Sequence, residues 1–199
     1  IASDRGGQTD LWTMFPDGSD PVRLTNNVDQ ELDASWSPDG SKIAYGRFTP
    51  GSGTDGWVTD AVGPVTDLWV MNADGSNRAN LTSMAGTLDY APAWSPDGRY
   101  LAMTLSKDGN PDIFVMDIAR RSLRPLTRHW SIDTEPAWSP DGRSIVFTSD
   151  RGGSPQIYKV PVSGGEPTRV TFEGDYNARA SYSPDGELLT MVTRVDGQY

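Results

Sequence analysis

The sequence predicts an all-β fold made of repeated four-stranded units, and three recurring markers support this. The tetrapeptide SPDG occurs four times, at 37–40, 95–98, 139–142 and 183–186. An apolar-aromatic run recurs as LWTM, LWVM, IFVM and IYKV, and LT or VT closes each unit. From the residue before each run to the closing threonine the interval is constant: Asp10 to Thr25, Asp67 to Thr82, Asp112 to Thr127, and Gln156 to Thr171. The period of about 44 residues is typical of a four-stranded antiparallel β-propeller blade.

One unit can be followed element by element over residues 136–171. PAWS predicts a short strand, and PDG a tight turn in which Asp bonds nearby backbone and Gly accepts a positive φ. SIVFTS is a continuous apolar strand, as expected when both faces are buried. DRGGSP then predicts a hairpin loop, QIYKVPV a third strand, SGGE a turn and PTRVT an outer strand. Frequent breakers (21 Gly and 15 Pro) leave helix as the minority state.

Equivalent positions in the units carry the same kind of side chain. One apolar column is Ile43, Leu101, Ile145 and Leu189, and a second is Tyr45, Met103, Phe147 and Met191. A bulky aromatic residue precedes each SPDG: Trp36, Trp94, Trp138 and Tyr182. We interpret these aromatic rings as packing between blades. A single blade cannot bury its own faces, so the pattern is repeated to let neighbours cover them.

We expect a single propeller domain over residues 1–199, with four to five blades. Its parts are a partial blade 1–25, a blade 34–82 with an insertion at 48–66, blades 92–127 and 136–171, and a partial blade 180–199. Residues 1–9 align with 147–155, so the first unit lacks an inner strand and the last lacks its outer pair. The terminal strands are expected to close a ring by pairing with each other. Otherwise the open blade edges favour self-association.

The charge and composition restrict the partners. A formal net charge of −10 argues against nucleic acid, because phosphate binding needs clustered Lys and Arg. It is compatible with a basic protein partner or a cation, as well as with simple solubility. Without cysteine the chain has neither disulfides nor a thiolate zinc site. No apolar stretch approaches the roughly 20 residues that span a bilayer. The opening IASDRGG lacks a signal peptide and indicates a piece of a longer protein.

The sequence predicts neither an enzyme nor a cofactor. The only histidine, His129, lies beside Trp130 in a loop and is interpreted as a surface ring. Nucleophile-elbow, P-loop and zincin motifs are absent. NADGSN and SKDGNPD lack the spacing and closing Glu of a calcium loop. A carboxylate pair or a cation in an acidic channel mouth stays open as an alternative, so the metal content is unknown.

The insertion FTPGSGTDGWVTDAVGPVT (48–66) lengthens one unit. It is either a functional lid or a tolerated loop, and tolerance is the favoured interpretation. Trp57 is the aromatic residue in it that we would suspect of contacting a partner.

The SPDG unit with its closing LT resembles the TolB-type (PD40, WD40-like) propeller repeat over essentially the whole chain. The likeness is sharpest from about residue 90, in APAWSPDGRYLAMTLSKDGNPDIFVMD, IDTEPAWSPDGRSIVFTSDRGGSPQIYKV and VTFEGDYNARASYSPDGELLTMVTRVDG. The resemblance implies part of, or a derivative of, a six-bladed propeller. It also implies a periplasmic, non-enzymatic scaffold of the Tol–Pal system, with peptidoglycan-associated lipoprotein as partner. The chain departs from the family in having too few repeats, no N-terminal α/β domain, and the 48–66 insertion.

The family's partner docks over the propeller face formed by loops that enter the inner strands. Carried over by resemblance, one such loop holds Leu88, Asp89 and Ala91, and the next holds Thr134 and Glu135. Repeat register adds Asn177 and Arg179, and then Glu31 and Asp33. From the residues alone, a polar column precedes the aromatic positions: Glu31, Asp89, Asp133 and Asn177. This column would ring a channel mouth, or else bond its own loop backbone. Glu135 and Arg179 differ between units while the scaffold does not, which favours a role in binding.

Three other functional classes fit the same repeats. One is a polysaccharide-processing propeller that uses carboxylates and a metal. The chain could be the gating propeller of a prolyl-oligopeptidase-type serine peptidase, whose G-x-S-x-G domain would lie outside these residues. It could also be an engineered or truncated propeller with no native function, as the overlapping termini suggest.

Overall fold

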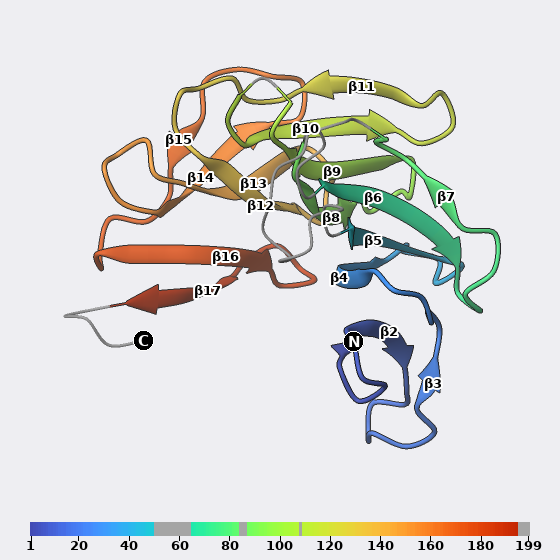
Figure 1. Cartoon of the computed structure of the whole chain (residues 1–199). Coiled ribbons are helices and arrows are strands. Elements are labelled where there is room, and N and C mark those ends of the chain that lie inside the picture. The colour runs from blue at the N-terminus through green and yellow to red at the C-terminus, as the bar shows by residue number, and fades with distance from the viewer. Residues whose placement is uncertain (50–64, 84–86, 108, 195–199) are drawn as a thin grey trace, which may run out of the picture. The chain divides into compact units, whose positions relative to one another are not determined.

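The structure, a computed structural model, describes residues 1–49, 65–83, 87–107 and 109–194, and all regular secondary structure in these ranges is β-strand (Figure 1). The chain divides into two compact units, Ile1–Tyr90 and Ala91–Tyr199. Most of the 48–66 insertion, including Trp57, lies outside the described residues, so the two interpretations of it stay predictions.

The described strands form consecutive sheets in chain order. The first is β1 (Ala2–Ser3), β2 (Asp10–Thr13) and β3 (Val22–Arg23); the second is β4 (Gln30–Trp36), β5 (Lys42–Thr49), β6 (Val65–Asn72) and β7 (Ala79–Asn80). The third is β8 (Asp89–Trp94), β9 (Tyr100–Leu105), β10 (Asp112–Asp117) and β11 (Ser122–Pro125); the fourth is β12 (Asp133–Trp138), β13 (Ser144–Ser149), β14 (Gln156–Pro161) and β15 (Thr168–Arg169). The last is β16 (Tyr176–Tyr182) and β17 (Leu189–Arg194). These blade-like sheets confirm the predicted all-β, four-stranded repeat.

The second strand of a blade is buried on both faces, as its unbroken apolar sequence predicts. Every residue of β13 is buried, and so is every residue of β9 after Tyr100. Their neighbours in the sheet satisfy the backbone, and the apolar side chains on both faces pack against adjoining sheets. The cluster around Ile145 and Phe147 includes Val115 from the preceding sheet, while Val146 packs with Ala180 of the following one.

The aromatic residue before SPDG packs between blades where the preceding sheet is complete. Trp138 is 9% exposed, donates its indole N–H to the carbonyl of Ala93 at 2.9 Å, and stacks on Tyr100 with centroids 6.5 Å apart. Trp36 differs from this expectation, since it is 51% exposed. The reason is local: the preceding sheet β1–β2–β3 has no inner strand among the described residues, so nothing occupies the place of Ala93.

The SPDG turn is closed by its own side chains. In the third copy, Ser139 Oγ donates to Asp141 Oδ1 at 2.6 Å and accepts from the amide of Ser144 at 3.0 Å. Gly142 has φ 68°, and its amide bonds the Ser139 carbonyl at 2.9 Å. The same bonds recur in the other three copies. This explains why the tetrapeptide repeats unchanged.

The constant interval before the closing threonine also has a physical cause. Each threonine hydroxyl accepts a hydrogen bond from the first amide of the apolar run, at 2.9 to 3.0 Å: Thr25 from Leu11, Thr82 from Leu68, Thr127 from Ile113, and Thr171 from Ile157. Thr127 donates in turn to Asp112 at 3.0 Å, and Thr171 to Gln156 at 2.8 Å. Any other interval would break both bonds, so the register is held.

Candidate protein-docking site

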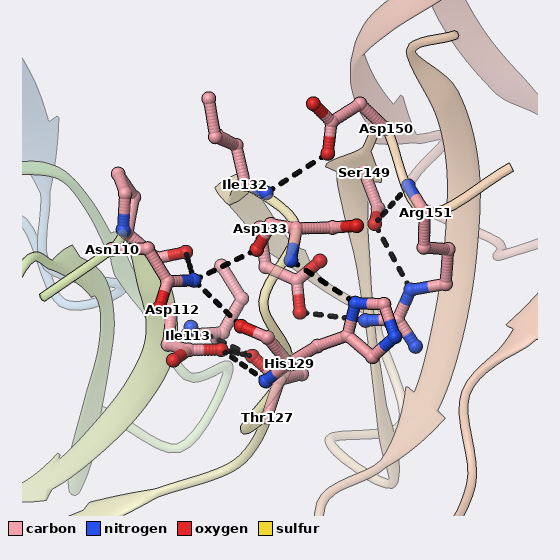
Figure 2. A network of polar contacts seen from close by, with 12 residues as sticks. Asn110, Asp112, Ile113, Thr127, His129, Ile132, Asp133, Ser149, Asp150 and Arg151 are labelled. Carbon is pink, nitrogen blue, oxygen red and sulfur yellow. Dashed lines mark hydrogen bonds and ion pairs between the residues drawn. The ribbon is translucent and has the colours of Figure 1, made fainter. Parts of the chain in front are cut away.

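The loop that joins β11 to β12 is held by a network of polar contacts (Figure 2). Asn110 Nδ2 donates to the carbonyls of His129 at 2.6 Å and Ser131 at 2.9 Å. The amide of His129 donates to Asp112 Oδ1 at 3.2 Å, and the amide of Ser131 donates to Nδ1 of His129 at 3.1 Å. His129 therefore has a structural task, as an acceptor inside the loop.

The far end of the loop is fixed to the β13–β14 hairpin. The amide of Ile132 donates to Asp150 Oδ1 at 2.9 Å, and Arg151 forms an ion pair with Asp133 at 2.6 Å (Figure 2). The Arg151 guanidinium lies over the rings of Phe147 and Tyr158, 5.4 and 5.0 Å from their centroids. Both ends of the loop are thus tied to buried strands, which orders it before any partner arrives.

This ordered loop exposes large apolar side chains. Trp130 is 79% exposed and Ile132 is 47% exposed. The equivalent loops of the other repeats also expose apolar side chains, namely Val28, Leu88 and Phe172. Repeated exposure at one kind of loop marks a surface for protein contact better than a scattered apolar residue does.

The inner strands contain a β-bulge beside these loops. Thr134 opposes Thr148 and Ala137 opposes Val146, so two residues of β12 face one of β13. Glu135, inside the bulge, has φ 56°, in the left-handed region. The residues at the same repeat position share this backbone: Asp33, Ala91 and Arg179. Holding a non-glycine residue there costs about 1–2 kcal/mol, so the surrounding contacts must favour it.

The bulge connects neighbouring sheets and carries charge. The amide of Glu135 donates to Thr104 Oγ1 at 3.2 Å, and its carboxylate accepts from Thr148 Oγ1 at 2.9 Å. Arg179 Nε forms an ion pair with Glu135 Oε1 at 3.0 Å, and its side chain is 76% exposed. An exposed cation beside a half-buried carboxylate leaves both polar groups available to a ligand.

The predicted location of the site residues in loops is wrong. Asp33 belongs to β4, Ala91 to β8, Asp133, Thr134 and Glu135 to β12, and Arg179 to β16. The bulge is the reason: it extends each inner strand towards its N-terminus by absorbing an extra residue. Of the predicted set, Leu88 lies directly before β8, in a bridge to Thr66.

The polar column is buried instead of lining an open mouth. Glu31, Asp89 and Asp133 are 0% exposed and Asn177 is 2% exposed. Glu31 accepts from Thr25 at 2.8 Å and Asn27 at 2.6 Å, while Asn177 donates to Gln156 at 2.9 Å. These side chains hold the blade joints together, and the exposed loop residues beside them face solvent.

Sequence reasoning missed Trp130, Ile132 and Phe172 as contact candidates. A signal existed: each follows a closing threonine, at a position where the repeat does not require an apolar side chain. Among the described residues, no group of three His, Cys, Asp or Glu side chains is placed to hold a metal ion. No described helix is long and apolar enough to cross a membrane.

Comparisons with known proteins decide the family. A family model described as the TolB beta propeller domain matches residues 59–199. The chain belongs to this family. A curated relative, the Tol-Pal system protein TolB of Desulfosudis oleivorans, is 34% identical to this TolB-like chain over 125 residues, which are 63% of the chain and 25% of the relative.

Solved structures agree with the assignment. TolB from Acinetobacter baumannii matches 95% of this TolB-like chain with a TM-score of 0.80 and 35% identity, over 44% of its own length. The chain thus spans less than half the length of these TolB relatives. Puromycin hydrolase matches with a TM-score of 0.64 at 19% identity, which shows a shared fold alone.

Proposed function

We propose that this TolB-like propeller is a non-enzymatic scaffold that binds a protein partner through the ordered loop at residues 128–132 and the adjoining bulge. The partner is of the peptidoglycan-associated lipoprotein type, the compartment is the periplasm, and the role is cell-envelope integrity within a Tol–Pal system. One observation carries the proposal: a loop fixed at both ends by hydrogen bonds exposes Trp130 and Ile132. The relatives named Tol-Pal system protein TolB support a protein partner from that system.

The energetics of docking favour such a loop. Exposed Trp is enriched among residues that dominate binding energy, because its large ring loses much water on burial. A loop already ordered by Asn110, His129 and Asp150 pays little conformational entropy when it binds.

Polar groups beside the apolar anchors would give the site its selectivity. Thr134 and Glu135 lie just after Ile132, in β12. Arg179, which pairs with Glu135, lies in β16. By repeat equivalence, Leu88 and Ala91 occupy this place in one further joint and Asp33 in another. We do not propose partner contacts for four buried side chains, whose role is to hold the strands beneath the exposed residues: Glu31, Asp89, Asp133 and Asn177.

Calorimetric titration of the chain with the soluble domain of peptidoglycan-associated lipoprotein tests this proposal. We expect saturable binding that is weakened at least 10-fold by Trp130→Ser, equivalent to about 1.4 kcal/mol. Leu188→Ser is the matched control, since Leu188 is an apolar residue 69% exposed just after an SPDG turn. Equal loss of affinity in both variants, or no binding by the folded wild-type chain, would contradict the proposal.

A further inference from the structure

Four equivalent joints link one blade to the next, and each brings together two polar side chains. One lies in the third strand of a blade, and the other lies in the inner strand of the next blade. The pairs are Asp10 with Glu31, Asp67 with Asp89, Asp112 with Asp133, and Gln156 with Asn177. Comparison of the four shows how each joint balances its charge.

Three of the joints are compensated. Arg23 pairs with Asp10, while Thr25 and Asn27 donate to Glu31. Arg151 pairs with Asp133, and Asp112 accepts hydrogen bonds from Thr127 and the His129 amide. In the last joint both groups are neutral amides, and Asn177 Nδ2 donates directly to Gln156 Oε1 at 2.9 Å.

The joint of Asp67 and Asp89 lacks such compensation. Asp89 is 0% exposed, and among the described residues no cation pairs with its carboxylate, whose polar neighbours are the hydroxyl groups of Thr82 and Thr87. Asp67 accepts one hydrogen bond, from Asn80 Nδ2 at 2.8 Å, through Oδ2, and its buried Oδ1 accepts none in the same part of the chain. Two carboxyl groups therefore share a joint whose described donors are all neutral, the Asn80 amide and the Thr82 and Thr87 hydroxyls.

The cations of neighbouring elements are engaged elsewhere. Arg47, opposite Asp67 in register, pairs with Asp29 and lies over Trp69. Arg78 donates to the carbonyls of Leu24 at 2.6 Å and Gly75 at 3.0 Å. Lys107 stands at the sequence position equivalent to Arg151, and its side chain is exposed. The remaining polar neighbours of Asp89 are the hydroxyl groups of Thr82 and Thr87.

We propose that the Asp67–Asp89 joint is a proton-binding site that makes this part of the propeller pH-sensitive. On acidification the Asp89 carboxylate takes up one proton from solvent. The summed charge of the two carboxyl groups then changes from −2 to −1. The protonated oxygen becomes a hydrogen-bond donor between the two carboxyl groups. The neutral pair Gln156–Asn177 is the permanent equivalent of this protonated state.

Electrostatics point in the same direction. Burial, and next to it the Asp67 carboxylate, raises the pKa of Asp89 to about 6, against the opposing effect of the Thr82 and Thr87 hydroxyls. Because the pKa in the folded state exceeds the unfolded value of about 3.9, the folded state binds the proton more tightly. Folding is therefore favoured as pH falls through about 6, and the gain levels off below about 4.

Leu88, the exposed residue before Asp89, belongs to the same strand entry, so protonation stabilises the segment that holds it. The inference itself stands without the proposed function, since it concerns the folded chain alone. Its consequence would be a propeller that is more stable in mildly acidic surroundings.

Denaturant unfolding of the whole chain between about pH 5 and about pH 8, with wild type and Asp89→Asn, tests the proposal. We expect the unfolding constant of the wild type, relative to that of Asp89→Asn, to rise by about 10-fold across this range. Asp133→Asn is the matched control, because Asp133 forms an ion pair with Arg151, and it should destabilise the chain at both pH values. Parallel pH profiles for wild type and Asp89→Asn would overturn the proposal.

A second measurement keeps the test independent of any variant. Carboxyl carbon NMR of the wild type should show Asp89 titrating near pH 6, and a midpoint below about 4 would overturn the proposal. Calcium or magnesium chloride, added at about pH 8, should leave stability unchanged. Stabilisation by either ion that disappears in Asp89→Asn would show a metal site in place of a proton site.

Discussion

The backbone amide of Glu135 donates a hydrogen bond to the hydroxyl of Thr104, in the neighbouring sheet, at 3.2 Å. The left-handed backbone of Glu135 aims the amide sideways, out of its own ladder. One repeat later, the amide of Arg179 donates to Thr148 Oγ1 at the same distance. A bulged residue and a threonine of the preceding blade thus join consecutive sheets, and this places Glu135 and Arg179 side by side.

Replacing the acceptor should weaken this joint. We expect Thr104→Val to lower the free energy of unfolding by about 1–3 kcal/mol, because the Glu135 amide loses its partner in a part-buried setting. Denaturant unfolding measures this. Thr168→Val is the control, since Thr168 is an exposed strand residue, and a loss as large there would mean that the amide contact is not the cause.

The strained backbone at the bulge gives an opposite expectation. Ala91 has φ 52°, and glycine adopts this conformation without steric cost. Ala91→Gly should therefore be neutral or raise stability by up to about 1 kcal/mol, as relief of strain outweighs the entropy of glycine. Thermal unfolding tests it against Ala93→Gly, at a strand residue with negative φ, which should destabilise. A marked loss in Ala91→Gly would show that the left-handed residue is not strained.

The buried ion pair beneath the docking loop should matter most for stability. Arg151→Met leaves the fully buried Asp133 without its cation, and we expect a loss of about 3–5 kcal/mol. Arg120→Met removes the partner of Asp117 at a site where the arginine is 72% exposed, and we expect a much smaller loss there because solvent screens the pair. Similar losses in the two variants would contradict the ranking by burial.

The turn aspartates give a pH-dependent expectation. The Ser37 hydroxyl, followed by the Ser41 amide and hydroxyl, lowers the pKa of Asp39 to about 2. The folded value lies below the unfolded one, so the turn's contribution is present above about pH 4 and lost as pH falls through about 2. NMR titration should show the pKa of Asp39 rising towards its ordinary value in Ser37→Ala. An unchanged pKa would mean that the hydroxyl is not the main cause.

The fold could be predicted from the sequence because hydrogen bonds between residues close in sequence define each repeat. SPDG encodes a turn whose bonds are internal, and the closing threonine encodes a strand register. The β-bulge was not predictable, because its residues, Asp33, Ala91, Glu135 and Arg179, share a backbone conformation and no side-chain property. The burial of the polar column was not predictable either, because Asp133 is covered by Arg151, a residue 18 positions away in the sequence.

The candidate site was only half predictable. Glu135 and Arg179 stood out because they vary while the scaffold repeats, and their ion pair brings them together. Trp130 and Ile132 drew no attention as contacts, since exposure depends on Asn110 and Asp150, which lie far from them in sequence and hold the loop outward.

Hydrogen–deuterium exchange of the chain with and without the lipoprotein domain tests the docking surface most directly. The account expects the partner to slow exchange in segments 128–135 and 172–179, and to leave the SPDG turns 95–98 and 139–142 unchanged. Slower exchange confined to those turns, with none at the Trp130 loop, would contradict it.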